Sequence, residues 1–183
     1  MSRLRKHYQQ VLPKLKTELG IANSHQVPKL TKVVINVGAG RAVSDNKFME
    51  IATNTLRKIT GQQPLSTTAK HSIAGFKLRQ GQKIGLKVTL RAERMYEFVD
   101  RLISIVLPRM RDFHGLSRSG FDAAGNYNLG LSDQSVFPEL SYEDTSVIHG
   151  LQISIVTSSN DAAGSAKLLE MLGVPLERSN RRG

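Results

Sequence analysis

The chain has 183 residues, of which 39% are hydrophobic, enough to bury one core and too many for a disordered basic tail. Its net charge of +11 and pI near 10.2 suit a polyanion or an anionic surface as partner. The absence of cysteine excludes disulfides and thiolate metal sites, and MSRLRKHYQQ lacks the apolar core of a signal peptide, so we expect a cytoplasmic protein.

The first 69 residues predict two helices and two strands. Apolar residues at Leu4, Tyr8, Leu15 and Leu19 mark one face of a helix that Gly20 ends. A strand over 29–38, a helix that ends at Gly61 and a short strand over 65–68 follow. The cations on the open face of the first helix are consistent either with plain solvation or with phosphate contact.

The middle of the chain begins with a glycine-containing basic loop at about 68–85, which cannot bury a core of its own and is expected to be flexible. Leu86, Val88 and Leu90 then alternate with cationic and polar residues, as in a strand. A helix from about Glu93 meets Pro108, which helix interiors tolerate poorly.

A loop-rich region at about 109–150 follows, and such a region is either functional or contains hairpins that the sequence does not reveal. The chain closes with an alternating strand over 151–157 and a helix that ends at Gly173. Together these elements predict a single α+β domain over 1–183. Its antiparallel-rich mixed sheet would carry helices on one face and leave the other face polar and available.

Three of the predicted strands agree on that polar face. It would collect Lys32 and Asn36, then Lys87, Thr89 and Arg91, then Gln152 and Ser154. Amides and hydroxyls can hydrogen-bond to base edges and ribose, while flanking cations hold phosphates. An ordinary solvent-facing sheet would show the same alternation, so the pattern alone leaves both interpretations open.

Enzymatic chemistry finds little support. The turn Gly38-Ala39-Gly40-Arg41 lacks the third glycine of a dinucleotide fingerprint, because position 43 is Val43, and no Walker motif follows. The five histidines show no metal spacing. We therefore expect no enzyme, cofactor, metal or small-molecule substrate, and an RNA-modifying enzyme would need a cofactor loop or acid/base pair that we do not find. With 5% aromatic residues, recognition of a folded RNA is favoured over stacking along a single strand.

The charge is distributed unevenly along the chain. Residues 1–69 carry a net +8, residues 70–120 a net +7 and residues 121–183 a net −4. About two thirds of the chain therefore suits a polyanion, while the last third suits a basic partner.

The sequence also resembles a known family in five collinear blocks: VPKLTKVVINVGAG, ITGQQPLSTTAKHSIAGFKLRQGQKIGLKVTLRAERMYEF, LPRMRDFHGLS, FDAAGNYNLGL and FPEL. These blocks resemble the bacterial form of the universal large-subunit ribosomal protein that binds 5S ribosomal RNA. The resemblance implies a non-catalytic α+β protein in the central protuberance of the large subunit, with a polar, concave sheet face that binds RNA. The implied partners are 5S rRNA, 23S rRNA, the P-site tRNA, a basic small-subunit head protein and neighbouring large-subunit proteins.

The resemblance assigns roles to three groups of residues. For 5S rRNA it implies Asn36, Gln62 and Thr89, beside which the polar face predicts Lys32, Lys87 and Arg91. For the elbow of the P-site tRNA it implies the basic loop with Lys70, His71, Lys77, Arg79 and Lys83. For an intersubunit bridge it implies the later loops, with Arg109, Arg111, Asp133, Glu139, Glu143 and Asp144.

Some positions depart from the family pattern. His71 and His114 replace residues that are usually basic, Ala123-Ala124 replaces a typical Gly-Arg pair, and the tail RSNRRG extends past the usual end. A free RNA chaperone or translational regulator with the same RNA-binding face is the alternative function.

Overall fold

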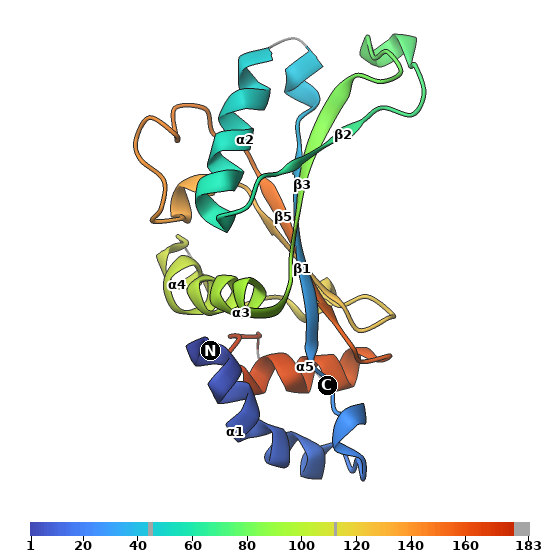
Figure 1. Ribbon diagram of the computed structural model, residues 1–183, viewed down its shortest axis with the longest axis vertical. Helices are drawn as coiled ribbons and strands as arrows, with labels where there is room; N and C mark the ends of the chain where they lie inside the picture. The colour runs from blue at the N-terminus through green and yellow to red at the C-terminus, as the bar shows by residue number, and fades with distance from the viewer. Residues whose placement is uncertain (44–45, 112, 178–183) are drawn as a thin grey trace. The chain divides into compact units, whose positions relative to one another are not determined.

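The computed structural model describes residues 1–43, 46–111 and 113–177 (Figure 1). The basic tail RSNRRG lies outside the described residues. Two compact units are present: unit 1 comprises the described parts of Met1–Val33, Leu90–Leu129 and Ser154–Gly183, and unit 2 comprises those of Val34–Thr89 and Gly130–Ile153. Within the described ranges, none of the helices combines the length and the apolar character needed to cross a membrane.

The fold is α+β, as the sequence predicts, and it contains a five-stranded antiparallel sheet. The strands are β1 (Leu30–Gly38), β2 (Leu65–Thr68), β3 (Lys83–Leu90), β4 (Tyr127–Leu131) and β5 (Leu151–Thr157), in the order β2-β3-β1-β5-β4. Strand β2 pairs with β3 with Leu65 opposite Lys87, and the register shifts between Thr67 and Thr68. Strand β4 was not predicted, because its five residues lie inside the region expected to be rich in loops.

Strict alternation of side chains gives the strands one buried and one open face. In β1, Val33, Ile35 and Val37 are each at most 1% exposed, whereas Asn36 between them is exposed. Strand β5 follows the same rule, with Leu151, Ile153, Ile155 and Thr157 buried. The buried faces supply the core, and the alternate positions form the open face.

In unit 1, helix α1 (Arg3–Glu18) packs against α3 (Ala92–Arg101) and α5 (Ala162–Met171). The Arg3 guanidinium donates to Asp100 at 2.6 and 3.1 Å and to Ser104 Oγ at 2.7 Å, and Arg5 pairs with Glu93. Two of the cations on α1 therefore hold the helix in place.

A π-helical turn, Leu102–Val106, joins α3 to the short α4 (Leu107–Arg109). The Leu107 N–H donates to the Leu102 carbonyl, five residues earlier. Pro108 has no N–H to donate, and the wider turn lets the chain continue helically through it. The helix thus continues to Arg109, past the proline that was expected to disfavour it.

In unit 2, helix α2 (Asn46–Thr60) buries Phe48, Ala52, Thr55 and Ile59 along one face. Hydrogen bonds of Gln134 hold the connection from β4 to β5. The amide of the fully buried Gln134 donates to the Val147 carbonyl at 2.8 Å and accepts from the His149 N–H at 2.7 Å.

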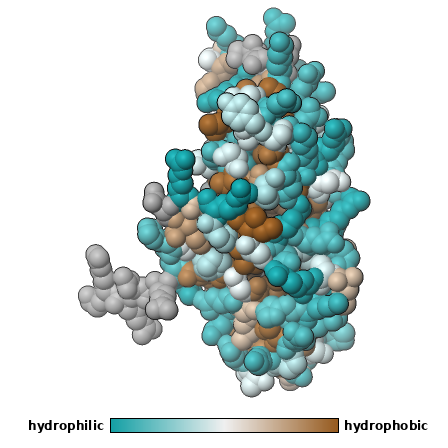
Figure 2. Space-filling model, turned by 90° about the vertical axis from the view of Figure 1, so that its left-hand side faces the viewer, coloured by the Kyte–Doolittle hydropathy of each residue, from teal (hydrophilic) through white to brown (hydrophobic). Residues whose placement is uncertain are grey.

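The face of the molecule in Figure 2 is mainly hydrophilic, with hydrophobic residues gathered in small patches.

Candidate nucleic-acid interface

The open face of β1 and β3 in unit 2 carries the first group of predicted residues. Asn36 on β1 and Lys87 on β3 are exposed, and Thr89 is half-buried. The two strands are hydrogen-bonded neighbours, and their alternate residues, such as Ile35 and Val88, are buried. Because neighbouring strands place same-face side chains within reach of one another, an amide, an ammonium and a hydroxyl lie together on this face.

Gln62 lies in the turn that joins α2 to β2, also in unit 2. Its N–H donates to Thr60 Oγ1 at 3.2 Å, and its carbonyl accepts from the same hydroxyl at 3.1 Å. Gly61 precedes it with φ +64°, a conformation that favours glycine and ends the helix. These contacts fix the backbone of the turn and leave the Gln62 side chain half-buried.

Three further residues of the predicted polar face lie in unit 1, whereas Gln152, exposed on β5, lies in unit 2. Lys32 is half-buried on β1, and Arg91 is exposed immediately before α3. Ser154 on β5 donates its hydroxyl to Asn128 Oδ1 on β4 at 2.7 Å. Asn128 was missed because β4 was missed, although the alternation of Tyr127, Leu129 and Leu131 around it was available as a signal.

The basic loop forms a hairpin that extends β2 and β3. Near its base the Ala69 N–H donates to the Gln82 carbonyl at 2.9 Å and the Ala69 carbonyl accepts from the Gly81 N–H at 3.0 Å, and Ile73 pairs with Leu78 near its tip. The side chains implied for tRNA contact are all exposed: Lys70, His71, Lys77, Arg79 and Lys83. The sequence predicts flexibility here, and the structure adds backbone pairing that holds the loop in a defined shape.

An exposed aromatic residue at the tip of this loop was missed. Phe76 is 75% exposed and Ile73 is 46% exposed. Phe76 lies between Gly75 and Lys77, and Lys77 adopts a left-handed conformation with φ 52°. A phenylalanine inside a glycine- and lysine-containing turn has no core to enter, and this was the available signal.

The residues implied for the bridge differ in exposure and in whether their side chains make contacts within the protein. Asp133 caps a turn by accepting from the Ser135 N–H at 2.7 Å, and Asp144 contacts Lys58 Nζ at 2.6 Å. Glu143 is exposed and Glu139 is half-buried, both in unit 2. Arg109 and Arg111, both in unit 1, are exposed at and beyond the end of α4.

The described residues include no group of three His, Asp or Glu side chains placed to hold a metal ion. Four of the five histidines are exposed, and the fifth, His149, is buried in unit 2. Polar and cationic side chains on open strands and loops therefore define the candidate interface.

Comparison with known proteins supports an assignment over nearly the whole chain. Residues 23–79 match the family described as ribosomal protein L5, and residues 83–176 match the model of the C-terminus of the same ribosomal family. Large ribosomal subunit protein uL5 of Natranaerobius thermophilus is 52% identical over 176 residues, which cover 96% of this chain and 98% of the relative. The uL5 of Sulfurimonas denitrificans is 48% identical over 181 residues, covering 98% and 99%. The uL5 of Francisella tularensis subsp. novicida is 51% identical over 179 residues, covering 97% and 99%.

These matches first define a class, the ribosomal proteins of the large subunit. Within that class the chain belongs to the L5 family, in the form that bacteria carry as uL5. The resemblance noted in the sequence is thereby confirmed. Membership of the family implies that the chain binds ribosomal RNA and other ribosome components.

Proposed function

We propose that this chain attaches 5S rRNA to the large subunit in the central protuberance, binding it through the open face of β1 and β3. One observation carries this proposal: Asn36 and Lys87 are exposed on adjacent strands, with Thr89 beside them, while the alternate residues are buried. The amide and hydroxyl can hydrogen-bond to bases or ribose, and the ammonium can hold a phosphate. Gln62, Lys32 and Arg91 are proposed to extend this contact.

The proposed function includes two further contacts. The exposed cations of the 68–85 hairpin support a contact with the elbow of the P-site tRNA, because phosphates are the partners that such side chains bind most readily. The acid-rich segment between β4 and β5 supports a bridge to a basic protein in the head of the small subunit. No step of this function is catalytic.

The 5S contact is tested by filter binding of the purified protein to isolated 5S rRNA. Asn36→Ala and Thr89→Ala should each weaken binding by about 1 to 3 kcal/mol, because each leaves RNA groups without a partner. The matched control is Asn54→Ala, which removes the same amide from an exposed position on α2. Thermal unfolding should be unchanged in all three variants, and full affinity in both interface variants would refute the site.

A further inference from the structure

The segment between β4 and β5 has an unusual charge for this protein. Residues 130–153 contain Asp133, Glu139, Glu143 and Asp144 and no lysine or arginine, although the whole chain carries +11. Carboxylates repel phosphates, so this segment is unsuited to lie on RNA. A basic protein surface is the complementary partner.

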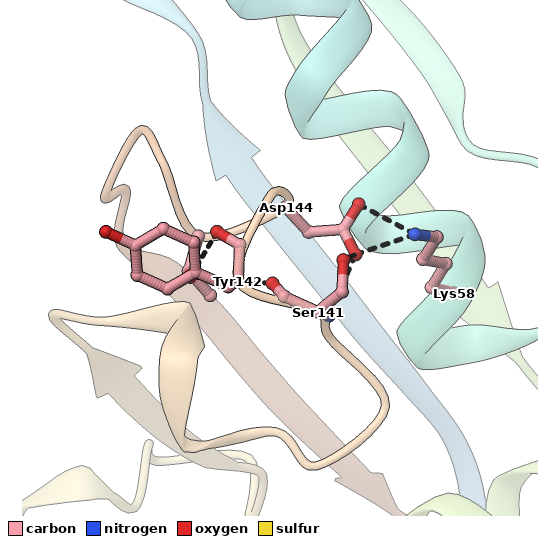
Figure 3. A network of polar contacts seen from close by, with 5 residues as sticks. Lys58, Ser141, Tyr142 and Asp144 are labelled. Carbon is pink, nitrogen blue, oxygen red and sulfur yellow. Dashed lines mark hydrogen bonds and ion pairs between the residues drawn. The ribbon is translucent and has the colours of Figure 1, made fainter.

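One of these acids is committed to the fold of unit 2. Asp144 is 13% exposed, and its two carboxylate oxygens lie 2.8 and 2.6 Å from Lys58 Nζ on α2. The N–H and hydroxyl of Ser141 donate to Asp144 Oδ2 at 2.9 and 2.7 Å (Figure 3). Lys58 and Ser141 lower the pKa of Asp144 to about 2, so the carboxylate is ionised at neutral pH. Lys58, Ser141 and Asp144 together are called the Asp144 clamp below.

The clamp fixes a compact turn, residues 141–146, which we call the Tyr142 turn. Backbone hydrogen bonds of 3.1 Å from Asp144 to Ser141 and 3.2 Å from Thr145 to Tyr142 close it, and the Thr145 hydroxyl also donates to the Tyr142 carbonyl at 2.9 Å. These bonds hold the backbone on both sides of Tyr142.

Tyr142 is the most exposed of the large hydrophobic side chains among the described residues. It is 93% exposed, and its ring points away from Lys58 in Figure 3. Tyrosine carries a large rigid surface on only two side-chain torsions, so it loses little entropy when a partner covers it. Residues of this type are enriched among those that dominate binding energy in protein interfaces.

We propose that Tyr142 is the anchor residue of a protein-binding site, and that the Asp144 clamp positions it. The occupant is a basic segment of a small-subunit protein, with an arginine or lysine over the Tyr142 ring and Glu143 as its ionic partner. A single arginine or lysine of the partner can lie over the aromatic ring and pair with the neighbouring carboxylate at the same time. This inference rests on the proposed bridge and names the residues that form it.

The absence of cysteine from the sequence gives a direct test. Tyr142→Cys introduces a single thiol, whose labelling by a maleimide is followed in reconstituted large subunits alone and after association with small subunits. We expect labelling to slow at least about tenfold on association, since anchor residues lie in fully desolvated positions. Lowering the magnesium concentration, which separates the subunits, should restore the original rate. Equal rates in the two particles would overturn the inference.

The affinity of the subunits for each other gives a second test. Tyr142→Ala should weaken association at least about fivefold, as expected for an anchor residue, whereas Tyr142→Phe should retain most of it because the ring remains. Lys58→Met should weaken association by less than Tyr142→Ala, and Lys58→Arg should restore it, because a cation again faces Asp144. Arg57→Met is the matched control, since it removes a neighbouring exposed cation of α2 and leaves the clamp intact.

Replacement of residues 140–146 by a glycine-serine linker of equal length separates this inference from the proposed bridge. If the replacement leaves subunit association unchanged, the bridge itself is wrong. If it weakens association while Tyr142→Ala does not, the bridge stands and Tyr142 is not its anchor. Binding to 5S rRNA should be unchanged in every variant, which would show that the substitutions leave the 5S contact of the large subunit intact.

Discussion

At the scale of single residues, His149 is the clearest case of a titratable group without a surface role. It is 6% exposed, both ring nitrogens are buried without a hydrogen bond, and its ring meets Phe48 edge-on at 5.8 Å between centroids. Burial lowers the pKa of His149 and outweighs the opposite influence of nearby backbone groups and of Asp133. The folded protein therefore holds this imidazole neutral where the unfolded chain would bind a proton.

The sign of the pH dependence follows from that difference. Above the ordinary histidine pKa of 6.5 both states are neutral, and below it the unfolded chain takes up a proton that the fold resists. The free energy of unfolding should fall by up to about 1.4 kcal/mol per pH unit below that point, until the folded protein is also protonated. Urea unfolding between pH 7 and pH 5 measures this slope. His149→Gln should make the slope shallower, and His71→Gln, at an exposed position, should not; identical slopes for His149→Gln and the unchanged protein would contradict the assignment.

At the scale of elements, the sequence predicted every strand except β4, which lies inside the region expected to be rich in loops. Alternating buried and open positions marked β1, β3 and β5, which were found, and the four-residue β2 was found as well. Strand β4 has five residues, with Asn128 and Gly130 on its open side, and it follows a glycine-containing turn. The strand order was not available either, because β1 lies between β3 and β5 through contacts between distant residues.

For the candidate site, too, the sequence predicted some features and could not predict others. Strand periodicity placed Asn36, Lys87 and Thr89 on one face, which the structure bears out. The ion pair between Asp144 and Lys58 could not be predicted, because 86 residues separate the two in sequence. Acidic composition alone could not separate an acid that holds the fold, such as Asp144, from one that faces solvent, such as Glu143.

The 68–85 hairpin carries a prediction about Phe76. If this hairpin contacts the tRNA, the 75% exposed ring should stack on a base or ribose between the phosphates that Lys77 and Arg79 hold. Phe76→Ala should speed the dissociation of P-site tRNA from ribosomes at least about fivefold, because stacking contributes roughly 1 to 3 kcal/mol per base. Phe76→Tyr keeps an aromatic face and should behave as the unchanged protein. Wild-type dissociation from the alanine variant would exclude a contact through the ring.

At the scale of the whole molecule, the two kinds of proposed partner correspond to stretches of chain with opposite net charge. Residues 1–120 carry a net +15 and residues 121–183 a net −4, so the polyanion and the basic protein are served by different stretches of chain. Such segregation keeps the acidic segment from weakening contacts with RNA, and it discourages the basic hairpin from binding the protein partner.

This separation makes the salt dependence of 5S binding diagnostic. Each phosphate contact contributes about 0.7 to 0.9 to the slope of log affinity against log salt, because binding a phosphate releases condensed counterions. Lys87→Gln should therefore reduce the slope by about one contact, in keeping with its exposed place on β3. Joint replacement of Lys77, Arg79 and Lys83 by glutamine should leave the 5S slope unchanged while weakening the retention of P-site tRNA. A loss of about three contacts from the 5S slope in this triple variant would instead place the hairpin on 5S rRNA and remove the basis for a separate tRNA contact.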